Sequence, residues 1–412
     1  MKRLTLEEWE SKYIVGPVER FNQTYTMFNR PDWDFEVRGR LQDWSFMGEA
    51  KDRPGWTLEE IGLRRATGPV TQMFTLFNMS KPNPSEASKA VMAALAAPNP
   101  GRAVATKPPE GTRIDTSDPQ RITGIIKKVA TYFGADLVGI CKLDRRWVYS
   151  HTYEADPYRV GNTEQPTGTS KPQEIPEEFQ YAVVMGFTMD YNLYKYFASP
   201  IAGAATGLGY SQMGFTNAFL SEYIRNLGFK VIDCSTNDVA LSTPMAMQAG
   251  LGDLGRNGLL ITPEFGPRVR ISKVITDLPL VADSPIEFGV TAFCEACGKC
   301  AETCPSQSIM SGERTAKPNN VSNAAGELKW PIDAETCRMY WARAKRGGGC
   351  TNCISSCPYN KVNTWPHRTV QWFTDHARWA DSFYVKMDDL LGYGKPKKPD
   401  NFWEEWQPKN HR

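Results

Sequence analysis

The chain has 412 residues and a formal net charge of +2, with 48 lysines and arginines against 46 aspartates and glutamates. This near-neutral balance gives no electrostatic reason to expect a nucleic-acid partner, and the absence of a run of about eighteen apolar residues argues against a transmembrane helix. The length suffices for one large hydrophobic core or two smaller ones.

The first part of the chain, residues 1–115, is polar and aromatic at its front and ends in a linker rich in proline and glycine. It shows no clean hydrophobic period over a long window, so we expect a covering region rather than an independent core. Its aromatic side chains are candidates to close a pocket, in particular Phe28, Trp33, Trp44 and Phe46.

Residues 116–287 predict an α+β core. Ser117 is a plausible N-cap for a helix whose apolar face ends near Gly134. Further along, the pattern predicts strands at 135–143, 181–189 and 229–233, a helix over 210–228, and a hairpin of 258–262 with 269–276 around the turn at 263–267. Cys141 and Cys234 lie in apolar, strand-like runs, and we expect both to be ordinary buried residues.

Residues 288–365 form the cysteine-rich part of the chain, and a tail rich in tryptophan follows at 366–412. The first run spells C-x2-C-x2-C-x3-C-P, the spacing of bacterial ferredoxins, in which the fourth cysteine reaches the other cluster. A return run keeps this spacing at its end, after one stretched gap. The spacing therefore predicts two [4Fe–4S] clusters, the first bound by Cys294, Cys297, Cys300 and Cys357, the second by Cys304, Cys337, Cys350 and Cys353. Zinc sites usually use two C-x2-C pairs, and disulfide frameworks belong to small secreted chains.

Two clusters move electrons one at a time, so we expect a second centre that performs the chemistry. No G-x-G-x-x-G follows a strand and opens a helix, which argues against a Rossmann dinucleotide site. The segment "AGLGDLGRNG" at 249–258 is rich in glycine. Its glycines either let the backbone approach something large and flat or simply make turns, and spacing alone does not choose between these two roles.

From about residue 120 to 365, the order of the motifs resembles the reductive dehalogenases, which are corrinoid and iron–sulfur enzymes that replace a carbon-bound halogen by hydrogen. The matching segments are "LGY…ND…AGLGDLGRNGLLITPEFGPRVRISKVITDLPL…FCEACGKCAETCP…CTNCISSCPYN". The "AGLG…GRNG" element is also similar to the epoxyqueuosine reductases. The resemblance implies a nitroreductase-like corrinoid-binding core joined to a ferredoxin-like domain with two [4Fe–4S] clusters. It also implies a base-off cobamide with no protein ligand on cobalt, and the chain has only four histidines.

The resemblance implies three catalytic residues. Tyr210 in "LGYSQMG" matches the proton donor, and Asn237 in "CSTNDVALS" matches the asparagine that helps to fix the halogen or the proton donor. Arg270 in "GPRVRI" matches the arginine that supports the tyrosine, with Arg268 as the alternative register. A phenol is a weak acid with a pKa of about 10, and a nearby guanidinium favours its phenolate. Without the family, Tyr210 would be a packing residue, Arg270 a surface ion-pair partner of a strand and Asn237 a turn residue.

The same resemblance implies residues that line the cofactor site. They are the glycines and asparagine of the glycine-rich segment together with an aromatic residue in the pocket wall, namely Gly250, Gly252, Gly255, Asn257 and Trp341. Plain core packing remains an equal alternative for Trp341.

The resemblance implies an organohalide substrate and a low-potential electron donor (ferredoxin, flavodoxin or a membrane quinol system), and it suggests a small membrane anchor protein as a further partner. We expect no signal peptide, because Met1 leads into an acidic segment. The chain is then cytoplasmic if Met1 is the native start, and exported and membrane-associated if a leader was removed. Three rival hypotheses stay open: an epoxyqueuosine reductase acting on tRNA, an electron-transfer or corrinoid-carrier protein without its own catalytic site, and an iron–sulfur flavoprotein.

Overall fold

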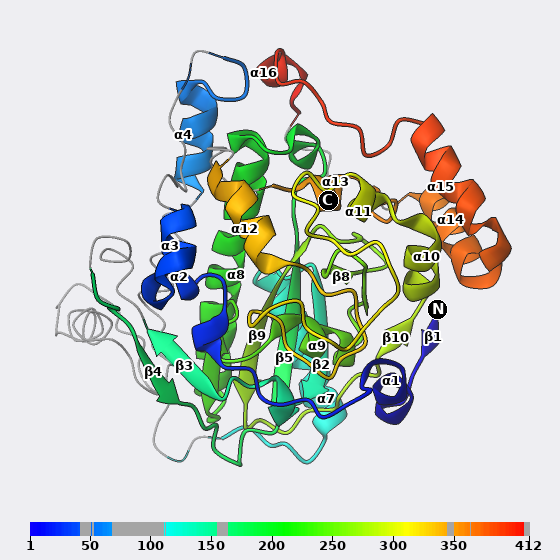
Figure 1. Cartoon of the computed structure of the whole chain (residues 1–412). Helices are drawn as coiled ribbons and strands as arrows, with labels where there is room; N and C mark the ends of the chain where they lie inside the picture. The colour runs from blue at the N-terminus through cyan, green and yellow to red at the C-terminus, as the bar shows by residue number, and fades with distance from the viewer. Residues whose placement is uncertain are drawn as a thin grey trace.

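A four-stranded antiparallel sheet forms the centre of the molecule in the computed structural model (Figure 1). The structure describes residues 1–41, 51, 53–67, 111, 113–154, 164–343, 350–362 and 364–407. In sheet order, the strands are β2 (Leu137–Lys142), β5 (Tyr181–Thr188), β9 (Val269–Thr276) and β6 (Val231–Cys234). Strand β5 is buried from Ala182 to Phe187. Its unbroken apolar sequence is typical of a strand that is covered on both faces.

Helices cover both faces of this sheet. On one face, α7 (Pro119–Tyr132) and α8 (Pro200–Asn226) bury a cluster that includes Ile126, Met213 and Leu220. On the other face, α9 (Ser242–Gln248) and α1 (Leu6–Tyr13) pack against β2, β5 and β6. The result is a three-layered α+β core, which is the predicted fold class.

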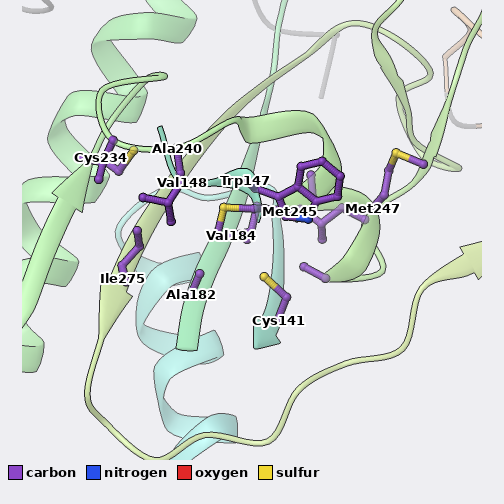
Figure 2. Packing of buried hydrophobic residues seen from close by; sticks show 14 of the residues in the cluster. Cys141, Trp147, Val148, Ala182, Val184, Cys234, Ala240, Met245, Met247 and Ile275 are labelled. Atoms are coloured by element: carbon purple, nitrogen blue, oxygen red, sulfur yellow. The ribbon is translucent and has the colours of Figure 1, made fainter. Parts of the chain in front are cut away.

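Cys141 and Cys234 lie in the second of these hydrophobic clusters, beside Trp147 and Met245 (Figure 2). Both cysteines are almost completely buried, with exposed fractions of 2% and 0%. Burial raises the pKa of the Cys141 thiol to about 12, which makes it unreactive at neutral pH. The prediction that these two cysteines are ordinary core residues is confirmed.

The predicted strands over 135–143, 181–189 and 229–233 are confirmed as β2, β5 and β6, but three details of the sequence analysis are wrong. The N-cap of α7 is Asp118 rather than Ser117, because the Asp118 side chain accepts a hydrogen bond from the amide of Arg121. Helix α8 begins ten residues before Tyr210, at Pro200. The predicted hairpin does not form, since β9 pairs with β5 and β6 instead.

The remaining strands form three short two-stranded sheets. They are β1 (Lys2–Arg3) with β10 (Ile286–Glu287), β3 (His151–Glu154) with β4 (Thr169–Pro172), and β7 (Asp253–Leu254) with β8 (Leu260–Ile261). Short 3-10 helices occur at η1 (Gln23–Tyr25), η2 (Arg145–Trp147), η3 (Leu193–Tyr196) and η4 (Arg378–Ala380).

The cysteine-rich part and the tail are helical and lie along one side of the core (Figure 1). Their helices are α10 (Val290–Cys297), α11 (Lys299–Glu302), α12 (Ala334–Arg343), α13 (Asn352–Ser355), α14 (Trp365–His376), α15 (Asp381–Leu390) and α16 (Phe402–Glu405). Lys299 and Lys361 both form ion pairs with Asp388, at 2.5 and 2.6 Å, which fasten the tail to the cysteine-rich part. In the described part of the chain, no helix combines the length and the apolar character needed to cross a membrane.

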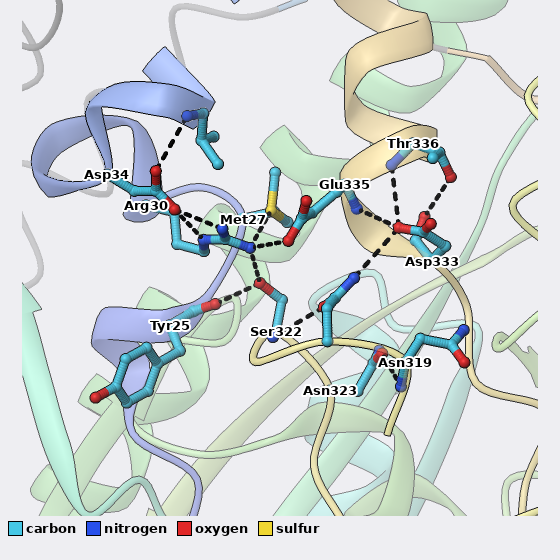
Figure 3. Close-up of polar contacts among 12 residues, drawn as sticks. Tyr25, Met27, Arg30, Asp34, Asn319, Ser322, Asn323, Asp333, Glu335 and Thr336 are labelled. Carbon is cyan, nitrogen blue, oxygen red and sulfur yellow. Dashed lines mark hydrogen bonds and ion pairs between the residues drawn. The ribbon is translucent and has the colours of Figure 1, made fainter. Parts of the chain in front are cut away.

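The N-terminal region is tied to the cysteine-rich part rather than standing apart. Besides α1, the described helices of this region are α2 (Arg30–Trp33), α3 (Phe35–Leu41) and α4 (Leu58–Ala66), and α4 lies alongside α8 (Figure 1). Arg30 forms ion pairs with Asp34 and with Glu335 of α12, and it donates to Ser322 at 3.3 Å (Figure 3). The Ser322 hydroxyl in turn donates to the carbonyl of Tyr25 at 2.7 Å. The domain boundaries predicted from sequence stay predictions, but the segments on either side of them are interleaved.

A second buried charge, Asp32, fixes the N-terminal region to the hairpin of β3 and β4. Its side chain is 1% exposed and accepts hydrogen bonds from the Tyr153 hydroxyl at 2.6 Å, the Thr167 hydroxyl at 2.8 Å and the Gly168 amide at 2.7 Å. Burial acts to raise the pKa of Asp32, but these hydrogen bonds outweigh it and lower the pKa below the ordinary value of 3.8.

We predict that Asp32→Asn destabilises the protein by about 2–3 kcal/mol, because one amide nitrogen then faces donors that need an acceptor. The pKa of Asp32 is lower in the folded protein than its ordinary value of 3.8. The variant should therefore differ most from wild type in stability at pH values above 3.8. This difference in stability should shrink as the pH falls through the lower pKa of the folded state. Thermal unfolding as a function of pH measures this. The control Glu36→Gln removes an exposed carboxylate from α3 and should change stability by less than about 0.5 kcal/mol. Equal effects of the two substitutions would contradict the prediction.

Candidate active site and cysteine sets

Tyr210 and Arg270 meet at one end of the central sheet. Tyr210 lies on α8 and Arg270 at the start of β9, where the guanidinium donates to the Tyr210 hydroxyl at 3.2 Å. The guanidinium carbon is also 4.6 Å from the centre of the phenol ring. This approach depends on Gly209, because a Cβ there would lie 3.1 Å from a side-chain carbon of Arg270 and of Met189. The structure therefore brings together two of the three residues that the sequence analysis named as catalytic.

The guanidinium of Arg270 also interacts with a second phenol, that of Tyr194 in η3. Burial acts to lower the pKa of Arg270, but the phenol oxygens of Tyr210 and Tyr194 outweigh it, and the pKa is raised. Tyr194 is completely buried, and its hydroxyl also lies 3.0 Å from that of Thr206. The sequence analysis missed Tyr194, since nothing in the segment around it distinguishes it from the neighbouring tyrosines.

Arg268, the alternative to Arg270, has a different set of partners. Its guanidinium donates to the Thr188 hydroxyl at 2.6 Å, the Met189 carbonyl at 3.0 Å and the Lys361 carbonyl at 3.2 Å. These contacts join the end of β5 to the cysteine-rich part of the chain. Between the two arginines, Arg270 is the one that contacts Tyr210.

Asn237 lies in the loop between β6 and α9, and its side-chain oxygen is bound by Ser242 rather than by Tyr210 or Arg270. The pairing of β6 with β9 ends with Cys234 opposite Lys273, and the chain leaves the sheet there, at the end where β9 begins. The Asn237 side chain is exposed in the loop that follows. Asn237 therefore follows β6 at the end of the sheet where Arg270 lies.

The eight motif cysteines fall into two sets of four by their mutual electrostatic effects. Burial and the charges of the set-mates raise the pKa of Cys300 and of Cys337 to about 12 each. Set one, defined by these interactions, contains Cys294, Cys297, Cys300 and Cys357. Set two is the predicted group of Cys304, Cys337, Cys350 and Cys353, and the charge of Cys300 from set one also acts on Cys353. Cys357 lines the same hollow as the first three cysteines of the other run, and the crossed assignment of all eight cysteines to two clusters stays a prediction.

The two sets lie next to each other, since Cys300, Cys304 and Cys353 pack in one hydrophobic cluster. Set one lines a hollow together with Phe293, Pro358 and Tyr359. The same three residues line a cavity of about 250 Å³ beneath α14 and α15. Set two lies toward the core, because the charge of Cys353 contributes to the raised pKa of Arg270 after the larger effects of burial and the two phenols. Backbone amides point at both sets: Arg256 donates to the sulfur of Cys294 at 3.5 Å, and Ser308 to that of Cys304 at 3.4 Å.

The glycines predicted to face a cofactor are all packed against the chain itself. A Cβ at Gly250 would lie 2.5 Å from the Ser284 carbonyl oxygen, and one at Gly252 would lie 2.2 Å from that of Ile261. At Gly255 the nearest atom would be a side-chain carbon of Ile261 at 2.8 Å. Close approach of the protein's own backbone therefore explains why glycine is needed at these positions, and their contact with a cofactor stays a prediction.

The other residues predicted to line the pocket lie around α12 and set two. Asn257 donates to the carbonyl of Cys353 at 3.3 Å. Trp341 of α12 and Phe28 of the N-terminal region both stack against the guanidinium of Arg338, at 5.6 and 5.0 Å from the ring centres. Trp33 is held by a hydrogen bond from its indole to the Thr24 carbonyl at 2.9 Å. The two other candidates, Trp44 and Phe46, lie outside the described residues.

Comparison with known proteins identifies relatives of the cysteine-rich part and of most of the chain. Residues 293–361 match the family model described as a 4Fe-4S dicluster domain. The chain is 39% identical over 305 residues to the tetrachloroethene reductive dehalogenase of Sulfurospirillum multivorans, covering 70% of this chain and 60% of that one. It is 33% identical over 401 residues to that of Dehalobacter restrictus, covering 89% and 71%. The structure of a catabolic reductive dehalogenase superimposes with a TM-score of 0.69 at 23% identity, covering 96% of this chain and 49% of that one.

The fold and the cysteines thus define an α+β protein with a 4Fe-4S domain. The chain belongs to the reductive dehalogenase family, since a relative at 33% identity is covered over 71% of its length. The chain spans 60% of the length of the Sulfurospirillum relative. A more distant similarity, 30% identity over 167 residues, links it to the epoxyqueuosine reductase of Listeria monocytogenes, but this covers only 39% of the chain.

We predict that Gly252→Ala lowers the thermal stability of the protein whether or not a corrinoid is added, because the new methyl group would meet the Ile261 carbonyl oxygen at 2.2 Å. The clash is with backbone, so the cost should reach the 1–3 kcal/mol typical of overpacking. The control is Gly62→Ala in α4, where no atom lies within 4 Å and the change should be neutral or stabilising by up to about 1 kcal/mol. If Gly252→Ala unfolds like wild type and loses only corrinoid, the glycine serves the cofactor instead.

Proposed function

We propose that this chain is a reductive dehalogenase that removes halide from an organohalide, with electrons delivered through two [4Fe–4S] clusters and a proton delivered by Tyr210. Family membership supports the reaction class. The single observation that carries the proposal within this chain is the contact of Tyr210 with Arg270, beside the charge of a set-two cysteine. An electron carrier without a catalytic site would have no need for a buried guanidinium held against a phenol.

Each cysteine set would hold one [4Fe–4S] cluster through four thiolates. We propose that electrons enter at set one, whose hollow shares the lining residues Phe293, Pro358 and Tyr359 with the cavity under the tail. They would then pass to set two, which lies nearer to Arg270. We propose a low-potential protein or quinol system as the donor, and a small membrane anchor protein remains part of this hypothesis.

A corrinoid fits the polar atoms that the structure leaves buried around this site. Within the described residues, Arg270 Nε, Ser272 Oγ and Trp341 Nε1 are buried and have no hydrogen-bond partner. A buried donor without an acceptor costs about 1–3 kcal/mol, and the amide side chains of a corrinoid are acceptors. We propose that Arg270 and Trp341 help to hold a cobamide here. When bound, it supplies a strongly reducing cobalt centre that cleaves the carbon–halogen bond.

The described histidines offer no ligand for such a cobalt. His151 lies in β3, and His367 and His376 lie in α14. In the part of the chain that the structure describes, none of them contacts Tyr210 or Arg270. We therefore propose that the cobamide is bound base-off and takes no ligand from a histidine.

The protein's own residues would handle the proton. The Tyr210 hydroxyl accepts a hydrogen bond from Arg270 and can donate its proton to the carbon that loses the halogen. Arg270 stays charged throughout and stabilises the phenolate that remains. Tyr194, on the other side of the guanidinium, would hold Arg270 in place.

The first test of the proposal is the pairing of the cysteines. We predict about eight irons per chain after anaerobic reconstitution, four for each cluster. Cys300→Ser and Cys357→Ser should abolish the same electron paramagnetic resonance signal and leave the other, although the two residues belong to different runs. Cys304→Ser and Cys353→Ser should do the reverse.

The buried Cys141 serves as the control, and Cys141→Ala should retain all the iron. If Cys304→Ser instead removed the same signal as Cys300→Ser, each run would bind its own cluster and the crossed assignment would be wrong. Zinc in place of iron in the purified protein would refute both clusters.

The second test concerns the proton donor. We predict that Tyr210→Phe slows halide release by about 10²–10⁴-fold, the usual contribution of a general acid, while the corrinoid content stays unchanged. Arg270→Leu should slow turnover through the same proton, and Arg270→Lys should rescue it only in part because an ammonium lacks the planar fork of guanidinium. The double variant should lose little more than either single one.

Tyr223→Phe provides a matched control on the same helix, since this tyrosine packs against the α8 side of the core. It should release halide at the wild-type rate. A near-native rate for Tyr210→Phe with full corrinoid content would leave Tyr210 as a packing residue.

A further inference from the structure

Asp233 of β6 is a half-buried carboxyl group that the proposed reaction has not used so far. Strand β6 is an edge of the central sheet, and Asp233 lies opposite Val274 of β9. Its side chain accepts a hydrogen bond from the amide nitrogen of Asn217 on α8. Tyr210 lies on the same helix, two turns earlier, which is about 10 Å along the helix axis. Asp233 therefore lies on the α8 side of the sheet, as Tyr210 does.

Polar side chains line the face of the sheet between these two residues. Alternate residues of a strand point to the same side, so Ser272 of β9 points toward α8 as Arg270 does. Asn217 lies beside Ser272, because its amide nitrogen also donates to the carbonyl of the next residue, Lys273, at 3.0 Å. Ser272 and Asn217 are each 0% exposed. They form a polar row within a layer that otherwise packs hydrophobic side chains.

Two atoms of this row are well placed to bind water. Within the described residues, Ser272 Oγ and Asn217 Oδ1 are buried and have no hydrogen-bond partner. Buried polar atoms are nearly always hydrogen-bonded to protein or to ordered water, and a buried water usually has about three polar partners. A hydroxyl group and a water molecule can each accept a proton on one side and give one up on the other. The row is therefore suited to carry protons.

The carboxyl group of Asp233 holds its proton more tightly than an ordinary aspartate. Burial and the negative charge of Asp238 raise its pKa to about 6, against the lowering effects of the Asn217 hydrogen bond and of Arg225 on α8. From β9, the neighbouring cation Lys273 points to the opposite face of the sheet, where it donates to the loop after β6 at 2.7 Å. Asp233 thus keeps a proton in an appreciable fraction of molecules near neutral pH, as an acid in catalysis needs.

Tyr210 must regain a proton after each turnover of the proposed reaction. Arg270, its hydrogen-bond partner, stays charged and cannot supply one. The phenol of Tyr194 is unsuited as well, because burial raises its pKa above the ordinary value of 10.0. Asp233 can supply the proton, since its pKa of about 6 is lower than the value of about 10 for a phenol. Its half-buried side chain also reaches solvent at the edge of the sheet.

We propose that Asp233 returns a proton to Tyr210 after each turnover, through the Ser272 hydroxyl and water that Asn217 holds. This inference rests on the proposed function. The O–H bond of Asp233 breaks and that of Tyr210 forms, while Ser272 accepts one proton and gives up its own. Asp233 then takes a proton from solvent. The relay moves no electrons. One relayed proton and two electrons from the clusters therefore balance the replacement of a carbon–halogen bond by a carbon–hydrogen bond, with halide leaving.

The test compares a single turnover with steady-state turnover of the holoenzyme, using a chlorinated ethene or phenol that the wild type dehalogenates. In a single turnover, reduced enzyme is in excess over substrate and Tyr210 already carries its proton. Asp233→Asn keeps an oxygen for Asn217 to bind but cannot release a proton, so it should leave the single-turnover rate unchanged. In steady state, kcat should fall by about 10²-fold, the lower end for loss of a group that transfers a proton. Asp233→Glu keeps the acid and should recover part of kcat.

Ser272→Ala removes the middle of the relay without changing the carboxyl group, and it is decisive if Asp233→Asn does not fold. It should lower kcat, leave the single-turnover rate unchanged and add little to the loss in the double variant. Thr216→Val is the matched control on α8, because the Thr216 hydroxyl donates to the carbonyl of Phe133 at 2.9 Å, outside the relay. It should behave as wild type in both assays.

The outcomes separate the inference from the proposed function. The relay is wrong if Asp233→Asn or Ser272→Ala keeps the wild-type kcat, or slows the single turnover as much as the steady state. It is also wrong if kcat falls only together with thermal stability or corrinoid content. Tyr210→Phe, by contrast, should slow both assays, because it has no phenolic proton to give. A wild-type holoenzyme that releases halide from no chlorinated ethene or phenol would overturn the proposed function itself.

Discussion

Three cations along one segment, two of them buried and Arg270 half-buried, constrain the rest of this structure. Arg268 precedes β9, and Arg270 and Lys273 lie within it, at the centre of the sheet. A buried charge is costly unless hydrogen bonds satisfy it, so each cation draws a different part of the chain toward the strand. Arg268 binds the carbonyl of Lys361 in the cysteine-rich part, Arg270 binds Tyr210 of α8, and Lys273 binds the loop after β6. The candidate active site is the place where these parts converge.

The same convergence joins the proposed electron path to the proposed proton donor. Helix α13 carries Cys353 and Ser355, and the Ser355 hydroxyl donates to the carbonyl of Tyr194 at 2.6 Å. Tyr194 in turn contacts Arg270, which contacts Tyr210. A rigid chain of buried contacts therefore links a set-two cysteine to the phenol. Such rigidity is what precise proton and electron delivery requires, since small displacements of reacting groups are costly.

Sequence patterns predicted most of the core elements because each is encoded by neighbouring residues. The apolar runs of β2 and β5 and the helical face of α7 follow from local periodicity. The hairpin prediction is wrong because it, too, depended only on local signals. Alternation and the turn at 263–267 are local signals, whereas the partners of β9 are decided by burial between β5 and β6, which belong to distant segments. The N-cap of α7 was displaced by one residue because both Ser117 and Asp118 are good capping residues.

By itself, the sequence determined that the chain has a ferredoxin-like cysteine-rich part, and it predicted the two cysteine sets, because ligand spacing in such a run is a local property. It also indicated the family and named Tyr210 and Arg270. Only the tertiary structure decided between Arg268 and Arg270, showed Tyr194 and Lys273, and gave the glycines of 249–258 a packing role against the chain itself. These features are contacts between residues far apart in the chain. They depend on strand register and on which charges become buried together, and no pattern of neighbouring residues records either.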